Sequence, residues 1–159
     1  MSEAPSFRSR YGPCALIAGA AVGLGAEWGR QIAAHGLDVV LLDRDGDALR
    51  PTADEIPQRH GVQVRALVLD LARTDLVEAI RAETAGLEIG LLVCNAACGV
   101  VAPFLELDAA QLQAMLDVNC RAPLLLAHAL APPMVQRGRG GIVLMSSLSG
   151  NIGSAQLAA

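Results

Sequence analysis

Lysine is absent from this chain of 159 residues, so all twelve of its basic residues are arginine. Aromatic residues make up only 3% of the sequence, and the single tyrosine, Tyr11, lies close to the N-terminus. With a net charge of -4 and no basic patch, the sequence does not indicate a nucleic-acid partner. Arginine and acidic residues also interrupt the apolar runs before they reach the ~18 residues that a membrane helix needs. We therefore expect a soluble protein that binds neither nucleic acid nor membranes.

Cysteine pairs with metal-ligand spacing are missing too. Cys14, Cys94, Cys98 and Cys120 contain no Cys-x-x-Cys pair, and most of them stand among aliphatic residues. This setting favours small buried thiols over disulfides or a zinc site. The three histidines are equally scattered. We therefore expect no metal ion.

The length of the chain fits one domain that buries about two thirds of its unfolded surface. Residues 1–12 are polar and contain no apolar segment that would act as a secretion signal. We therefore expect a flexible N-terminal leader over residues 1–12, one domain over residues 13–159, and a cytoplasmic protein.

Three closely spaced glycines interrupt an apolar run near the N-terminus. The run Ala15-Leu16-Ile17-Ala18 leads into Gly19-Ala20-Ala21-Val22-Gly23-Leu24-Gly25. This pattern predicts a strand, a tight turn and a helix. Glycine reaches positive φ without a Cβ penalty, and the N-terminus of the following helix presents unpaired N–H groups to a ligand. The pattern favours a phosphate group there, although a glycine-lined helix packing or a bare turn has the same spacing.

An acidic residue ends the second predicted strand, which runs from Leu37 to Asp43. Asp43 stands 18 residues after Gly25. In nucleotide-binding βαβ units, a carboxylate near this position accepts hydrogen bonds from the adenosine ribose hydroxyls. Its charge would repel a 2′-phosphate, which favours NAD over NADP. The neighbouring Arg44 keeps NADP as the less favoured choice.

Three further apolar runs end in polar or small residues. Asp70 and Leu71 follow the run Val62 to Leu69, Asn95-Ala96-Ala97 follows Ile89 to Cys94, and Ser146-Ser147 follows Gly141 to Met145. Helices are expected over Thr74 to Ala85, Asp108 to Val118 and Pro123 to Arg137, with Asn119 between the last two. This alternation predicts an α/β fold with parallel strands and helices on both faces. Since ligands of such sheets bind at the carboxyl ends of the strands, the strand-end residues should form one site.

These motifs together resemble the N-terminal, cofactor-binding part of the short-chain dehydrogenase/reductase family, from about Pro13 to Ala159. The family pattern Thr-Gly-x-x-x-Gly-x-Gly appears here with Ala18 in place of threonine, and Asn-Asn-Ala-Gly appears with two changes, Cys94 and Ala97. Asp70-Leu71, Val118-Asn119 and residues 141–147 also match. The resemblance implies a Rossmann-type doubly wound parallel sheet with strand order 3-2-1-4-5, whose C-terminal strands are missing from this chain.

The resemblance also implies a reaction, namely hydride transfer between a nicotinamide and an alcohol or carbonyl carbon of a small substrate. Ser147 would hydrogen-bond the substrate oxygen, and Asn119 would support a proton relay through its backbone. Family members commonly form dimers or tetramers through the helix that corresponds to Pro123 to Arg137. The residues that would bind the cofactor are Gly19, Ala21, Val22, Gly23, Leu24, Gly25, Asp43, Arg44, Asp70, Leu71, Asn95, Ala96 and Ala97.

The acid–base tyrosine of the family lies thirteen residues beyond its serine, which corresponds to position 160, and a lysine follows four residues later. Neither Tyr11 nor any lysine of this chain fills these roles. We favour the cofactor-binding part of an NAD-dependent dehydrogenase. A non-catalytic nucleotide-binding module or pseudoenzyme that is complete at Ala159 is the alternative. An S-adenosylmethionine-dependent methyltransferase is disfavoured, because such sites want an acid near the end of the first strand, where Ala18 stands.

Overall fold

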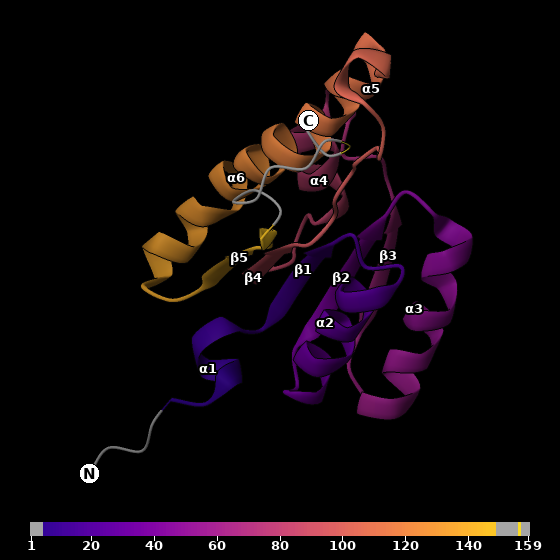
Figure 1. Cartoon of the computed structure of the whole chain (residues 1–159). Helices are drawn as coiled ribbons and strands as arrows, with labels where there is room; N and C mark the ends of the chain where they lie inside the picture. The colour runs from indigo at the N-terminus through magenta and orange to yellow at the C-terminus, as the bar shows by residue number, and fades with distance from the viewer. Residues whose placement is uncertain (1–4, 149–155, 157–159) are drawn as a thin grey trace.

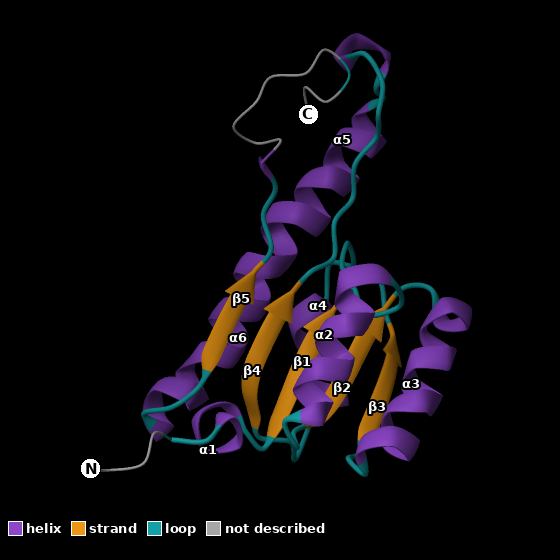
Figure 2. Ribbon diagram, turned by 60° about the horizontal axis from the view of Figure 1, so that its bottom comes forward, coloured by secondary structure: helices purple, strands orange, loops and turns teal. Residues whose placement is uncertain are grey.

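Five parallel strands form a single sheet in the order β3-β2-β1-β4-β5 (Figure 1). The computed structural model describes residues 5–148 and residue 156. Its strands are β1 (Cys14–Ala18), β2 (Asp38–Asp43), β3 (Val64–Val68), β4 (Ile89–Cys94) and β5 (Gly141–Leu144). All five arrowheads in Figure 2 point to the same edge of the sheet. The predicted fold class and strand order are confirmed.

Helices cover both faces of the sheet (Figure 2). On one face, α2 (Gly23–Ala34) and α3 (Gly46–His60) pack in a core cluster with Ile17 and Leu41. On the other face, α4 (Leu76–Glu83) and α6 (Ala122–Arg137) pack in a second cluster with Leu16 and Leu42. Neighbouring residues of one strand thus enter different clusters, because successive strand side chains point to opposite faces. This is why the central strands are continuous apolar runs.

The helical segment that precedes β5 is continuous, whereas the sequence predicted a break at Asn119. It begins at α5 (Ala109–Leu116), continues through the π-helical turn η2 (Asp117–Arg121) and joins α6. Asp108 caps α5 in a capping box with Gln111. Pro123 stands four residues after Asn119 and has no N–H, so the regular α-helical bond to the Asn119 carbonyl does not form. The chain widens into a π turn at this point instead of breaking.

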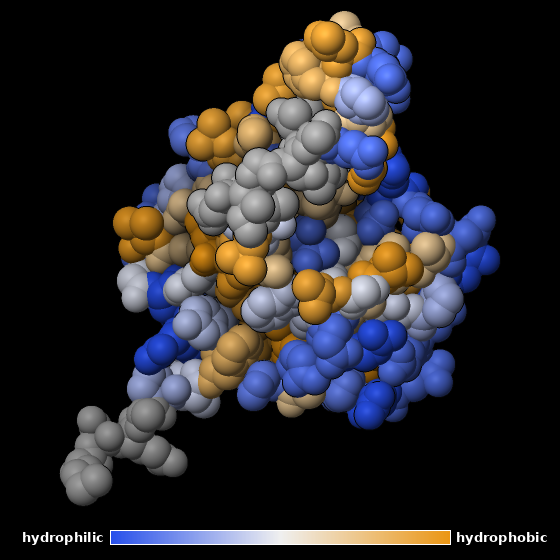
Figure 3. Space-filling model, in the orientation of Figure 1, coloured by the Kyte–Doolittle hydropathy of each residue, from blue (hydrophilic) through white to orange (hydrophobic). Residues whose placement is uncertain are grey.

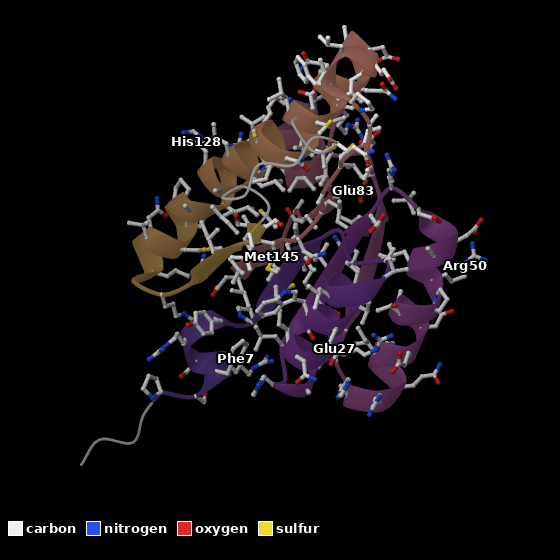
Figure 4. The ribbon with its side chains drawn as sticks, in the orientation of Figure 1. Phe7, Glu27, Arg50, Glu83, His128 and Met145 are labelled. Atoms are coloured by element: carbon white, nitrogen blue, oxygen red, sulfur yellow. The ribbon has the colours of Figure 1, made fainter. Side chains whose placement is uncertain are left out.

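Residues 5–12, within the predicted N-terminal leader, contain a short helix that contacts the domain. Phe7–Tyr11 form a short helix, α1, and Phe7 is labelled in Figure 4. The Phe7 ring stacks on His35 with a centroid distance of 4.6 Å. Tyr11 packs against the core cluster on the α2 side of the sheet, and the Arg8 guanidinium donates to the Gly36 carbonyl. These two rings therefore cover apolar surface at the amino end of the sheet. Residues 1–4 lie outside the described part.

The outer face of α6 remains exposed. Leu126 and Leu130 are buried in the core, whereas the side chains of Leu124 and Val135 are 70% and 77% exposed. Hydrophilic side chains, drawn in blue, lie over much of α3, and hydrophobic side chains, drawn in orange, gather at the α5 end of the molecule (Figure 3). Across residues 5–148, no helix is long and apolar enough to cross a bilayer.

Candidate functional site: a cleft at the carboxyl edge of the sheet

A cleft of about 290 Å³ opens where the parallel strands end. Nine of the residues that the sequence assigned to the cofactor line it: Gly19, Val22, Asp43, Arg44, Asp70, Leu71, Asn95, Ala96 and Ala97. Four further lining residues were missed, namely Leu42, Leu69, Cys98 and Val118. Each of these four directly precedes or follows a predicted residue, so adjacency to the motifs was the available signal. These residues converge at one edge because all the strands are parallel and their carboxyl ends lie side by side.

The glycine-rich turn forms one end of this cleft. Gly19 has φ +83°, and a Cβ added there would lie 2.5 Å from the Ala96 Cα. A Cβ on Gly25 would overlap the Gly19 carbonyl oxygen. Since α2 begins at Gly23 and Val22 provides no side-chain cap, the first amide groups of this helix keep their donors for another partner. Of the predicted turn residues, Ala21, Gly23, Leu24 and Gly25 shape the turn without lining the cleft.

Asp43 supports the turn from the end of β2. Its Oδ2 accepts a hydrogen bond from the Ala21 N–H at 3.0 Å, and its Oδ1 accepts one from the Asp45 N–H at 3.2 Å. The Thr52 hydroxyl donates to the Ala21 carbonyl at 3.5 Å from inside the protein, so both backbone groups of Ala21 are held. A carboxylate has about four acceptor sites, so Asp43 retains capacity for ligand hydroxyls.

Asn95 connects the turn to β4. Its Nδ2 donates to the Gly19 carbonyl at 3.0 Å, while the N–H groups of Asn95 and Ala96 both donate to the Ala18 carbonyl. The Asn95 side chain therefore contacts the protein's own turn, a partner that the sequence did not predict. It fixes the distance between the ends of β1 and β4.

Asn119 holds the loop that follows β4. Its Oδ1 accepts a hydrogen bond from the Cys98 N–H at 2.8 Å, and its Nδ2 donates to the Cys98 carbonyl at 2.7 Å. The side chain is thus engaged, and the backbone carbonyl receives no α-helical hydrogen bond from Pro123, which has no N–H. Asn119 does not line the cleft, and its backbone role in a proton relay stays a prediction.

Ser147 lies at the same edge, three residues beyond β5. The Met145 N–H donates to the Cys94 carbonyl at 3.0 Å, which continues the pairing of β5 with β4 past the end of the strand. Ser147 is exposed. Residues 149 and 150 lie outside the described residues.

Neither buried thiol acts as a nucleophile near neutral pH. Burial raises the pKa of the Cys14 thiol and of the Cys94 thiol to about 11, and the thiolate is the reactive form. No set of three or more His, Cys, Asp or Glu side chains within residues 5–148 converges as metal ligands. An open groove of about 740 Å³ between α3 and β3 shares Arg44 with the cleft but no other predicted residue.

The fold and the cleft define the class of protein. Residues 13–159 match the family model that describes short chain dehydrogenases, so the chain belongs to the short-chain dehydrogenase family. It is 33% identical over 143 residues to the very-long-chain 3-oxoacyl-CoA reductase of Homo sapiens, a match that covers 87% of this chain and 46% of the human protein.

Solved structures show the same similarity. A 7β-hydroxysteroid dehydrogenase structure superposes with a TM-score of 0.91 at 27% identity, and the match covers 96% of this chain and 59% of that one. A short-chain dehydrogenase from Sphingobium yanoikuyae in complex with NADPH has a TM-score of 0.85 at 33% identity over 92% of this chain and 57% of that one. The chain spans about half the length of the curated relatives that it matches.

Proposed function

We propose that this chain forms the cofactor-binding part of an NAD(P)-dependent oxidoreductase, which transfers a hydride between the nicotinamide ring and an alcohol or carbonyl carbon. One observation carries the proposal: residues at the ends of four neighbouring strands line a single cleft beside the glycine-rich turn. Membership of the short-chain dehydrogenase family supports it. A bound dinucleotide would supply the hydride donor or acceptor.

The residues of the cleft fit such a dinucleotide. The uncapped amide groups at the start of α2 suit the diphosphate, because a helix N-terminus attracts anions. Asp43 suits the ribose hydroxyls as a hydrogen-bond acceptor. Leu69, Leu71 and Val118 add apolar surface for a base, next to the polar Asp70.

NAD is the cofactor that we favour over NADP. The Asp43 carboxylate at the ribose end of the cleft carries a negative charge that opposes a 2′-phosphate. Arg44 also lines the cleft and would attract that phosphate. We give Asp43 the greater weight because it is half-buried and fixed by two backbone N–H groups, whereas Arg44 is exposed.

The substrate is an apolar alcohol or ketone in this proposal. The segment from Cys98 to Phe104 begins at a residue that lines the cleft and carries only uncharged residues. It would form one wall of a substrate pocket. Ser147 would hydrogen-bond the substrate oxygen, and the Asn119 carbonyl would hold a water molecule of the proton relay. A second copy of the chain is the proposed partner, through the exposed face of α6 where Leu124, His128 and Val135 lie (Figure 4).

Two cysteines provide a test of the site. Cys98 lines the cleft, whereas Cys120 is exposed on η2 and does not line it. Saturating NAD should slow the alkylation of Cys98 several-fold and leave the alkylation of Cys120 unchanged, as measured peptide by peptide by mass spectrometry. Protection by S-adenosylmethionine and not by NAD or NADP would contradict the proposal, and so would equal rates at Cys98 with and without either dinucleotide.

A further inference from the structure

Arg121 links the π-helical turn η2 to the loop that follows β3. Its Nη2 donates to the Ala72 carbonyl at 2.8 Å and to the Arg73 carbonyl at 3.0 Å. Its Nε donates to Asp117 Oδ1 at 2.6 Å. The Arg121 side chain is 31% exposed and that of Asp117 is 18% exposed. Since Asp117 fixes the plane of the guanidinium, Arg121 reaches the two carbonyls in one defined orientation.

The loop that Arg121 holds is a wall of the cleft. Leu69, Asp70 and Leu71 line the cleft directly before Ala72. Asp70 Oδ1 accepts a hydrogen bond from the Ala72 N–H at 2.8 Å, and the Arg73 N–H donates to the Asp70 carbonyl at 3.3 Å. Asp70 thus binds the N–H side of this turn, while Arg121 binds its carbonyl side. The two together determine where Asp70 and Leu71 lie.

The same π turn also holds the opposite wall. Asn119 makes two hydrogen bonds to the Cys98 backbone, and Val118 lines the cleft itself. Therefore η2 contacts both the loop after β3 and the loop after β4, which face each other across the cleft. The width of the cleft at this end depends on two side chains that are two residues apart in one helical turn.

We propose that Arg121 is a positioning residue for the adenine half of the cofactor. By binding the Ala72 and Arg73 carbonyls, it keeps Asp70 and Leu71 at the adenine end of the cleft. Asn119 holds the backbone of Cys98 in the loop after β4. This inference rests on the proposed function, since it assumes a dinucleotide in the cleft. Arg121 itself does not line the cleft and acts through the loop.

The two halves of the cofactor allow this role to be measured separately. In the protein that carries this chain, Arg121→Ala should raise the Kd for ADP-ribose about ten-fold, the size expected for hydrogen bonds from a charged group. The Kd for nicotinamide mononucleotide should stay within about two-fold of wild type, because that half binds away from the loop. If turnover is followed, KM for the dinucleotide should rise while kcat stays unchanged.

Arg139→Ala is the matched control. Arg139 also binds one carbonyl, that of Ser9, and one carboxylate, that of Glu88, but it does so at the amino end of the sheet. This variant should bind ADP-ribose as the wild type does. Arg121→Lys keeps a positive charge beside Asp117 and lacks the planar fork, so it should fold normally and lose part of the ADP-ribose affinity.

The outcomes separate the two claims. Wild-type affinity for ADP-ribose in both Arg121 variants, or an equal loss of both half-ligands, would overturn the positioning role. A wild-type protein that binds neither ADP-ribose nor NAD would overturn the proposed function itself. A selective loss of ADP-ribose affinity in Arg121→Ala, absent in Arg139→Ala, supports the positioning role.

Discussion

Replacement of Asp43 by asparagine should shift the cofactor preference toward NADP. Unit charges about 4 Å apart repel by about 1 kcal/mol in water and about 4 kcal/mol at an effective dielectric constant of 20. The half-buried Asp43 lies between these limits, so removal of its charge should favour NADP relative to NAD by about ten- to a hundred-fold. The asparagine oxygen still accepts the hydrogen bond from the Ala21 N–H, so the glycine-rich turn keeps its support.

Asp43→Asn tests the charge of Asp43 more specifically than Asp43→Ala does. The alanine variant would also remove the hydrogen bond that the Ala21 N–H donates to Asp43. Only the bond from the Asp45 N–H is lost, and because that residue is exposed, water replaces it at a cost below about 1.5 kcal/mol in unfolding free energy. Calorimetric titration with NAD and NADP measures the preference, and thermal denaturation checks the fold. Asp47→Asn is the control, since its carboxylate is 96% exposed and does not line the cleft. An unchanged ratio of the two affinities in Asp43→Asn would refute the assignment of Asp43 to the ribose.

Three other predictions concern the turn, the buried thiols and α6. Gly25→Ala should abolish NAD binding, because its Cβ would overlap the Gly19 carbonyl; retained affinity in a calorimetric titration would contradict the packing of α2 against the turn. The pKa of Cys14 and of Cys94 in the folded protein, about 11, lies above the ordinary value of 9.0. These thiols therefore stabilise the fold below pH 9 and lose that contribution as the pH rises toward 11. Denaturation at pH 8 and pH 10.5 should show a smaller alkaline loss in a Cys14→Ala/Cys94→Ala double variant than in the wild type, and an equal loss would oppose this account. Leu124→Glu should lower the oligomeric mass seen by light scattering without unfolding the chain, whereas Leu130→Ala should cost about 2–5 kcal/mol of stability because Leu130 is buried. An unchanged mass for Leu124→Glu would exclude this face of α6 as the contact.

The sheet and most of the cleft could be predicted because their signals are local. Each central strand is a short apolar run, since both of its faces pack against helices, and each run ends in a residue of the cleft. Because the strands are parallel, these ends lie at one edge of the sheet, independently of the conformations of the loops. The positions of Asp43, Asp70 and Asn95 at the ends of strands were therefore enough to predict that they line the cleft.

The partners of these side chains could not be predicted in the same way. Asp43 binds Ala21, 22 residues away, and Asn95 binds Gly19, 76 residues away. Arg121 reaches Ala72 across 49 residues. Contacts at such separations depend on the packed tertiary structure, and no local pattern of residue types specifies them. The role of η2 in holding two loops was missed for this reason.

Two other differences from the predicted structure have local signals in the sequence. Pro123, four residues after Asn119, indicated that the helix there could not keep regular hydrogen bonding. Phe7 and Tyr11 are spaced four residues apart, as apolar residues on one face of a helix are. Both residues lie in α1, and their rings pack against the core cluster on the α2 side of the sheet.

A crystal structure of the protein with NAD is the most direct test of the cofactor site. We predict the diphosphate at the start of α2, the adenosine ribose at Asp43, and the adenine beside Leu71 in the 290 Å³ cleft. A dinucleotide bound instead in the open groove between α3 and β3, or a cleft that stays empty at saturating NAD and NADP, would contradict the proposed cofactor site.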